Sequence, residues 1–356
     1  IYTAHPILSL SFSLSPTTNL ITPLLHKAVL RSLSESDARE AALALMSGEV
    51  PPAQAGGLLS ALRVRGENGG EILGFARALR EHAAPFALPG LGLIDTCGTG
   101  GDSLGTFNVS TLAGIVAAAC GARVAKHGNR AVSSRCGSAD LLEALGVKID
   151  GAPRVAARCI DEAGFGFLFA PTYHPTLRQL APLRRELGFR SIFNLVGPLA
   201  NPARVTRQVV GVPSAAYLLP VAEALQALGL DHAFVVHGAD GADEISLTGP
   251  TTLIEVRPGR LDTLMIHPED AGLATCRPGD LAGGDAAENA AIANRILGGE
   301  RGHAHDFVVI NAAAALVVAG RAGSLREGAV QAREALLSRR ARSVLDTVRR
   351  VSQEAA

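Results

Sequence analysis

Short apolar runs alternate with alanine-rich segments from residue 90 to about residue 350, and this alternation constrains the fold more than any other feature. The apolar runs have the length of buried strands, and the segments between them have the composition of helices. Such alternation is typical of a mostly parallel sheet with helices on both faces. We therefore predict a large α/β domain over 90–350. Its strands are expected at 91–95, 122–126, 147–150, 165–170, 208–212, 232–238, 251–256 and 261–266.

The preceding part of the chain has a different pattern. Residues 24–84 show helical periodicity with capping and stop signals, such as Ser34 before an acidic turn and Gly48 after it, so we expect a small all-α domain there. Residues 1–23 contain three prolines and no charged side chain other than His5. They lack the basic start of a signal peptide, and we expect a disordered extension.

The composition narrows the classes of partner. Lysine and arginine number 33, as do aspartate and glutamate, and there is no tryptophan, so no global charge favours a nucleic acid or a membrane as partner. Five scattered cysteines lack C-x-x-C spacing, which argues against a disulfide framework and a zinc site. We expect a cytoplasmic protein that acts on a small molecule.

Two adjacent segments predict a site for an anion. The loop 98–102, GTGGD, follows the first strand, and its glycines allow positive φ angles and a close approach of the backbone to a ligand. Residues 108–111, NVST, then open an apolar helix, whose N-terminal N–H groups attract negative charge. The next strand leads into Lys126 and Arg130, which add two cations. A phosphorylated substrate fits this combination best.

The glycine pattern excludes two common nucleotide sites. In the run that starts at Gly98, Ser103 occupies the place of the third glycine of a dinucleotide fingerprint. The chain also contains no Walker A string.

Other polar groups have both a functional and an ordinary interpretation. Asp243 and Glu244 follow the strand 232–238, at the sheet edge where ligands bind, and are either Mg²⁺ ligands or a solvated surface pair. One arginine of the segment 174–200 is a candidate to grip a carboxylate, while at least two of its four are expected to be solvated. His174 precedes Pro175 and either shapes a turn or lines a pocket, and a lone histidine favours the turn. His303 and His305 are expected in a loop.

The ordered motifs together resemble the anthranilate phosphoribosyltransferase family. The resemblance covers about 24–351, and it implies transfer of a phosphoribosyl group from phosphoribosyl pyrophosphate to anthranilate in tryptophan biosynthesis, with Mg²⁺ as cofactor. It also implies that the segment 174–200 joins the helical domain in space and that the protein is a homodimer. The motifs are GTGGD at 98–102, TFNVST at 106–111, KHGNRAVSSRCGSADLLEALG at 126–146, RRELGFRSIFNLVGPLANP at 184–202, HGADGADEIS at 237–246 and GGDAAENA at 283–290.

The same resemblance implies roles for individual residues. The contacts to phosphoribosyl pyrophosphate would be Gly98, Gly101, Asp102, Thr106, Asn108, Val109, Ser110, Thr111, Lys126, His127, Gly128, Asn129, Arg130, Ala131, Val132, Ser133, Ser134 and Ser138. Those to anthranilate would be Gly98, Asn129, His174 and Arg184. The Mg²⁺ ligands would be Ser110, Asp243 and Glu244. No general base is assigned, and His127 is only a candidate to remove the amine proton after attack.

Two alternatives belong to different functional classes. A pyrimidine nucleoside phosphorylase shares the fold, but its phosphate loop typically reads KHSTGGVGD, a string that does not occur here. A paralogue without transferase activity that binds nucleic acid is the second alternative, because fold alone does not determine function. The zero net charge and the presence of Arg184, Asp243 and Glu244 speak against it.

Overall fold

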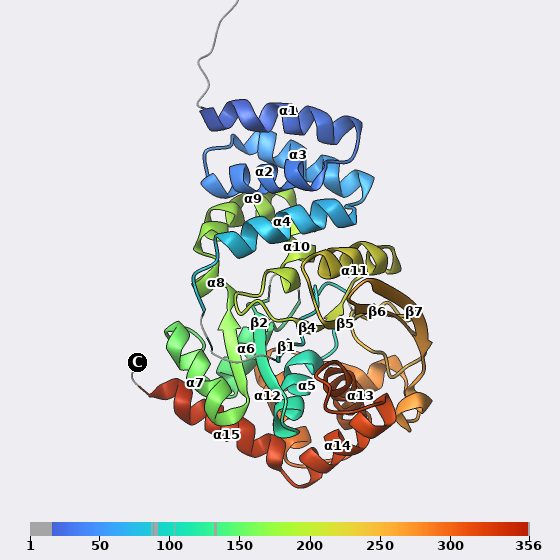
Figure 1. Ribbon diagram of the computed structural model, residues 1–356. Helices are drawn as coiled ribbons and strands as arrows, with labels where there is room; N and C mark the ends of the chain where they lie inside the picture. Colours follow the sequence, from blue (N-terminus) through green and yellow to red (C-terminus); the bar gives the residue numbers. More distant parts are fainter. Residues whose placement is uncertain (1–15, 87, 89–91, 103, 132–133, 355–356) are drawn as a thin grey trace, which may run out of the picture.

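The computed structural model describes residues 16–86, 88, 92–102, 104–131 and 134–354. A stack of helices lies at one end and a larger α/β unit at the other (Figure 1). The stack contains α1 (Pro16–Leu30), α2 (Glu35–Ser47), α3 (Pro52–Arg65) and α4 (Gly69–Glu81).

Local capping fixes the ends of the stacked helices. Ser34 and Asp37 form a reciprocal capping box at the start of α2, and Gly48 ends that helix in the left-handed conformation. Asn68 and Glu71 form the same box at α4. The Glu71 carboxylate is fully buried, accepts a hydrogen bond from the Leu33 N–H at 2.8 Å and pairs with Arg65, so it joins α4 to the end of α3 and to the loop between α1 and α2.

A segment between β3 and β4 completes the helical stack. It contains α8 (Ala170–Tyr173), α9 (Ala181–Leu187) and α10 (Ile192–Val196), with 3₁₀ turns at Pro175–Leu180 and Pro198–Ala200. Leu180, Phe193 and Val196 share one apolar core with α1–α4, and Phe193 contacts Phe75 edge to face at 5.4 Å between ring centroids. We call α1–α4 together with residues 170–200 the helical unit.

The predicted boundary at residue 24 is wrong. Helix α1 begins at Pro16 and contains Pro23, so residues 16–23 are part of the helical unit, while 1–15 lie outside the described residues. Ile21 is fully buried and packs with Leu24 and Ala28 in the same core. Burial of this apolar face outweighs the hydrogen bond that a proline removes from a helix interior.

The α/β unit contains one seven-stranded sheet in the order β3-β2-β1-β4-β5-β6-β7. The first five strands in this order are parallel, and β6 and β7 add an antiparallel edge. The predicted mostly parallel sheet is therefore confirmed. The strands are β1 (Leu93–Asp95), β2 (Arg123–Gly128), β3 (Phe165–Phe169), β4 (Arg207–Gly211), β5 (His232–Gly238), β6 (Thr251–Arg257) and β7 (Arg260–Ile266).

Alternating side chains bury both faces of this sheet. Val209 and Val236 point into a core with α5 and α13, whereas Val210 and Val235 point into the core shared with α11 and the helical unit. The helices of this unit are α5 (Val109–Ala119), α6 (Ser138–Ala144), α7 (Pro153–Ala163), α11 (Leu218–Ala227), α12 (Ala286–Leu297), α13 (His303–Val318), α14 (Leu325–Leu337) and α15 (Arg340–Gln353), with further 3₁₀ turns at Ala215–Tyr217, Pro268–Ala271 and Pro278–Leu281.

The predicted strand at 147–150 is absent, and these residues form a loop between α6 and α7. Val147 and Ile149 are buried in the core below the sheet, and the Lys148 N–H donates to the Ser352 hydroxyl at 3.1 Å. The alternation of apolar and polar residues at 147–150 therefore reflects the packing of a loop against helices, and not a strand in the sheet. No helix in the described ranges combines the length and apolar character needed to cross a membrane.

Candidate active site

The loop after β1 lies at the carboxyl edge of the parallel sheet, against the end of β4. The Thr99 N–H donates to the Gly211 carbonyl at 2.9 Å, and the Thr99 hydroxyl donates to the same oxygen at 3.1 Å. Gly100 and Gly101 have φ angles of +66° and +87°, which side chains other than glycine rarely adopt. The loop thus exposes backbone at the edge where α/β proteins bind ligands.

Asp243 and Glu244 reach this loop from the connection between β5 and β6. A Cβ atom built on Gly211 would lie 1.4 Å from the Asp243 carbonyl oxygen, so only glycine permits this approach. A Cβ on Gly98 would lie 3.0 Å from the Asp243 carboxylate. The backbone thus places the carboxylates beside the glycine loop.

Negative charge accumulates at this point. Burial and the neighbouring Asp102 carboxylate raise the pKa of Asp243 to about 7. Burial and the Asp243 carboxylate likewise raise the pKa of Glu244 well above its usual value. A cation bound beside Asp243 and Glu244 would stabilise their ionised forms.

Lys126 supplies a buried positive charge next to these acids. Its side chain is 1% exposed, and the ammonium donates to the Thr96 carbonyl at 3.0 Å and to the Ser110 hydroxyl at 3.4 Å. The Ser110 hydroxyl, in the first turn of α5, also hydrogen-bonds Glu244, whose pKa this contact lowers against the larger effect of burial. Strand β2, helix α5 and the β5–β6 connection therefore meet at one cluster.

Arg190, from the helical unit, contacts the glycine loop. Its guanidinium donates to the Thr99 carbonyl at 2.9 Å and lies over Gly101, where a Cβ atom would be 1.4 Å from Nη1. Burial lowers the pKa of Arg190, and the Asp243 and Asp102 carboxylates partly oppose that effect. From the sequence, Arg190 is only one of four arginines in the segment 174–200. Nothing local in the sequence shows which of the four folds back over the glycine loop.

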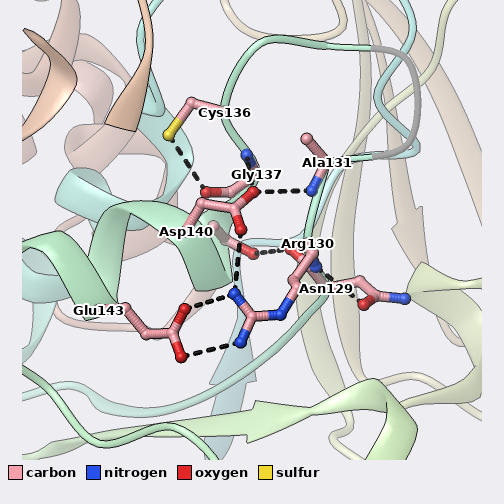
Figure 2. A network of polar contacts seen from close by, with 8 residues as sticks. Asn129, Arg130, Ala131, Cys136, Gly137, Asp140 and Glu143 are labelled. Carbon is pink, nitrogen blue, oxygen red and sulfur yellow. Dashed lines mark hydrogen bonds and ion pairs between the residues drawn. The ribbon is translucent and has the colours of Figure 1, made fainter. Parts of the chain in front are cut away.

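Arg130 pairs with two acids of α6. Figure 2 shows its guanidinium between the carboxylates of Asp140 and Glu143, with Nη2 donating to Glu143 at 2.8 Å and Nη1 to Asp140 at 3.2 Å. It also lies over the Phe169 ring, 5.6 Å from the centroid. Two acids of α6 therefore neutralise Arg130 in the described chain, and its expected contact with phosphate stays a prediction.

Asp140 instead shapes the loop that follows β2. Its carboxylate accepts hydrogen bonds from the Ala131 and Gly137 N–H groups, each at 2.8 Å (Figure 2). Asn129 is exposed, and its carbonyl accepts from the Ser138 hydroxyl at 3.3 Å. The loop thus closes on itself at 129–138. Two predicted contacts, Val132 and Ser133, lie outside the described residues, whereas Ser134 is exposed on this loop.

A pair of asparagines joins this loop to the start of α5 and to the 283–290 motif. The Asn108 amide donates to the Cys136 carbonyl at 2.9 Å, and the buried Asn289 amide donates to the Asn108 oxygen at 3.0 Å. Thr106 forms an isolated β-bridge with Ala282 just before that motif. Asn108 therefore makes no side-chain cap on α5, and its neighbours Val109 and Thr111 are buried in the helix.

The two histidines of the predicted site lie beneath it. His127 and His174 are 4% and 3% exposed, and their rings meet edge to face at 5.2 Å. The Nδ1 of His127 is 3.1 Å from the Gly197 carbonyl, and the Nε2 of His174 is 3.1 Å from the Ala200 carbonyl, so those nitrogens carry the protons. Burial lowers the pKa of His127 to about 3 and that of His174 to about 4. Neither environment fits a group that accepts a proton from a substrate, and His174 is a buried side chain at the end of α8.

Arg184 remains without an acidic partner in the described chain. It lies on α9 with its guanidinium 5.8 Å from the Phe193 ring centroid. Burial and the nearby Arg190 lower its pKa. Two neighbouring guanidiniums, one of them unpaired, form a second positive region next to the glycine loop.

His303 and His305 are in helix α13 and not, as predicted, in a loop. His305 is buried, with Nδ1 2.9 Å from the Asp306 carboxylate, and His303 lies 3.9 Å from Asp280. The described residues contain no cluster of three or more histidine, cysteine or acidic side chains arranged as a complete metal cage. The five cysteines, all within the described ranges, form no disulfide.

Known proteins share both units. The model of the glycosyl transferase family a/b domain matches residues 91–342, and the model of its helical bundle domain matches residues 18–83. The chain is 53% identical to an anthranilate phosphoribosyltransferase of Rubrobacter xylanophilus over 325 residues, which are 91% of this chain and 95% of that protein. This chain belongs to the anthranilate phosphoribosyltransferase family.

Solved members of the anthranilate phosphoribosyltransferase family have the same fold. The enzyme from Thermus thermophilus superposes with a TM-score of 0.88 at 48% identity, over 93% of this chain and 99% of that one. The Saccharomyces cerevisiae enzyme in complex with PRPP and Mg gives a TM-score of 0.86 at 27% identity, over 94% of this chain and 98% of that one. The expected two-unit fold is thus confirmed.

The buried histidine pair predicts a pH-dependent stability. Because the folded state holds the pKa of His174 near 4, below its usual value of about 6.5, this residue's contribution is complete above about pH 6.5 and is lost as the pH falls towards 4. The unfolding free energy of the wild type should fall between about pH 7.5 and pH 5. In His174→Asn, we expect this fall to be smaller by roughly 2 kcal/mol. Urea titrations at both pH values measure it.

The control for this comparison is His26→Asn, which changes an exposed histidine of α1. It should retain the pH dependence of the wild type. Equal pH dependence in His174→Asn and the wild type would contradict a neutral, buried His174.

Proposed function

We propose that this chain transfers the 5-phosphoribosyl group of phosphoribosyl pyrophosphate to the amine of anthranilate, releasing pyrophosphate. The supporting observation is the convergence of Lys126, the glycine loop, the start of α5 and the Asp243–Glu244 pair at one sheet edge. The chain's membership of the family, and its likeness to relatives of that name over more than nine-tenths of its length, agree with this reaction. No observation favours a nucleoside phosphorylase or a nucleic-acid-binding protein.

The donor fits the positive groups of the sheet edge. Departure of pyrophosphate from C1 of the ribose leaves positive charge on the sugar and adds negative charge to the leaving oxygens. Within the described chain, α5 has no side-chain cap, and the Val109 and Thr111 N–H groups donate to the backbone carbonyls of Phe107 and Asn108. The Ser110 N–H would face a phosphate oxygen at this helix end, with Lys126 behind it. Preorganised donors of this kind stabilise the developing charge without reorganisation.

Ser110, Asp243 and Glu244 would hold Mg²⁺. Their oxygens are the donors that this ion prefers, and it commonly binds few protein carboxylates together with phosphate oxygens. The raised pKa values of Asp243 and Glu244, which arise from burial and mutual repulsion, fit a pair that a cation completes. When bound, Mg²⁺ would neutralise part of the pyrophosphate charge. The Saccharomyces cerevisiae relative in complex with PRPP and Mg supports the use of Mg²⁺.

The acceptor would lie between the glycine loop and α9. Arg184, which has no acidic partner in the described ranges, would bind the anthranilate carboxylate, with Gly98 and Asn129 on the facing loops. The Saccharomyces cerevisiae relative in complex with 4-fluoroanthranilate supports an aromatic acid as acceptor. An aromatic amine is neutral at pH 7, so orientation matters more than deprotonation, and we assign no general base.

A direct assay tests the reaction. Anthranilate fluorescence should fall when the protein is given phosphoribosyl pyrophosphate and Mg²⁺, and pyrophosphate should appear in equal amount. Phosphorolysis of uridine and thymidine and binding of a nucleic acid serve as comparison reactions. Phosphorolysis without loss of anthranilate fluorescence would favour the phosphorylase alternative and overturn the proposal.

The acceptor clamp makes a separate prediction. Arg184→Ala should raise the KM for anthranilate about tenfold or more and change that for phosphoribosyl pyrophosphate by less than about twofold, because a charge-assisted hydrogen bond to the acceptor is lost. Steady-state kinetics in both substrates measure this. Arg185→Ala, on the exposed side of the same helix, is the matched control and should change neither constant. A similar rise in both KM values for Arg184→Ala would refute the clamp.

We also propose that the chain forms a homodimer through its helical unit. Val29 and Leu30 at the end of α1 and Val64 near the end of α3 are 65%, 84% and 88% exposed. Since α1 packs against α3, these side chains offer an apolar area that a second copy would cover. Sedimentation velocity should give a dimer for the wild type and a lower mass for Val64→Lys, whereas a monomeric wild type would contradict the dimer.

A further inference from the structure

A separate, positively charged cavity lies at the opposite edge of the sheet from the candidate active site. A cavity of about 300 Å³ opens where α4 ends, between the residues that precede β4 and those that precede β5. Because both strands begin here, the cavity faces away from the carboxyl edge that carries the candidate active site. Its polar lining comes mainly from Arg77, Arg80, Glu81, Arg204 and Thr206.

The cavity has more positive charge than its own acids can neutralise. The Glu81 carboxylate is held by Arg39, with Nη2 to Oε2 at 2.5 Å, and Arg77 pairs with Glu35. Within the described chain, no carboxylate pairs with Arg80 or Arg204. Two guanidiniums therefore line the cavity without an ion-pair partner of their own in the described residues.

Arg80 is held rigidly and has an unused donor. Its Nε donates to the Leu199 carbonyl at 2.6 Å, while its Nη2 is buried without any hydrogen-bond partner. Burial, with a contribution from Arg204, lowers the pKa of Arg80 to about 10. A buried N–H without an acceptor is costly, so such a group points to a missing partner.

Arg204, which lines the same cavity, has a strained backbone. Its φ is +48°, and Arg339 is the only other non-glycine residue in the described ranges with a positive φ. Its N–H donates to the Asn201 carbonyl at 3.0 Å, which fixes the turn. Strained backbone of this kind tends to occur at ligand clamps.

We propose that this cavity binds a compact phosphoryl dianion, either inorganic phosphate or a small phosphate monoester, between Arg80 and Arg204. Guanidinium groups match phosphate oxygens through paired N–H donors. The anion would accept from the orphan Nη2 of Arg80 and join the helical unit to the α/β unit. The residues after Leu199 also contact groups that lie beneath the candidate active site: the Ala200 carbonyl accepts from His174, and the Asn201 amide donates to Asp95, at the end of β1, at 2.8 Å.

Equilibrium dialysis against radiolabelled inorganic phosphate tests the site by counting the anions bound to each chain. Any binding at the active site is common to all the proteins compared. Arg204→Asn should bind one phosphate fewer than the wild type at millimolar phosphate, because asparagine tolerates a positive φ but cannot donate to the anion. Arg301→Asn, which removes an exposed arginine elsewhere, should match the wild type.

A second variant tests the proposal even if Arg204→Asn does not fold. Glu81→Gln removes a negative charge from the cavity and should bind phosphate more tightly, by about two- to fivefold. Equal stoichiometry in Arg204→Asn and the wild type, or unchanged affinity in Glu81→Gln, would overturn the proposal.

Competition identifies the source of the anion. If glycerol 3-phosphate displaces the Arg204-dependent phosphate at a lower concentration than unlabelled phosphate, the ligand is a monoester, and otherwise it is free phosphate. Displacement by succinate at a lower concentration than either would contradict a phosphoryl ligand.

Discussion

The repulsion among the Asp102, Asp243 and Glu244 carboxylates is the interaction on which the rest of the site depends. Gly211 and Gly98 allow the chain to bring Asp243 against the glycine loop, and the buried Lys126 offsets only part of the charge. Burial, together with the neighbouring Asp102 carboxylate, raises the pKa of Asp243 to about 7. A polyanionic donor that arrives with a divalent cation would complete this balance.

Arginines of the helical unit complete the other side. Arg190 lies over Gly101 and binds the Thr99 carbonyl, and Arg184 lies beside it with no acid to pair with. Both come from the segment that leaves the sheet after β3 and packs with α1–α4. The helical unit therefore supplies Arg184 and Arg190 to this region, whereas Lys126, Asp243 and Glu244 come from the α/β unit.

The fold class and the position of the glycine loop and the Asp243–Glu244 pair at the carboxyl edge of the sheet could be predicted from the sequence, because they depend on periodicity and on residues close together in the chain. The sequence could not reveal that Asp140 and Glu143 would neutralise Arg130, or that His127 and His174 would be buried against each other. Those contacts depend on how the loop after β2 and the end of α8 pack.

The start of α1 was missed because Pro23 suggested a break, whereas burial of Ile21 maintains the helix. Arg190 and Asn289 lie in motifs that the sequence had shown, but only long-range contacts reveal what each one touches.

A magnesium titration of the transferase rate tests the central claim most directly. In Asp243→Asn with Glu244→Gln, the Mg²⁺ concentration for half-maximal rate and the KM for phosphoribosyl pyrophosphate should rise together, by about tenfold or more, because the oxygens that would hold the ion lose their charge. Asp262→Asn, on the edge strand β7, is the control and should titrate like the wild type. An unchanged magnesium dependence in the double variant would contradict the account.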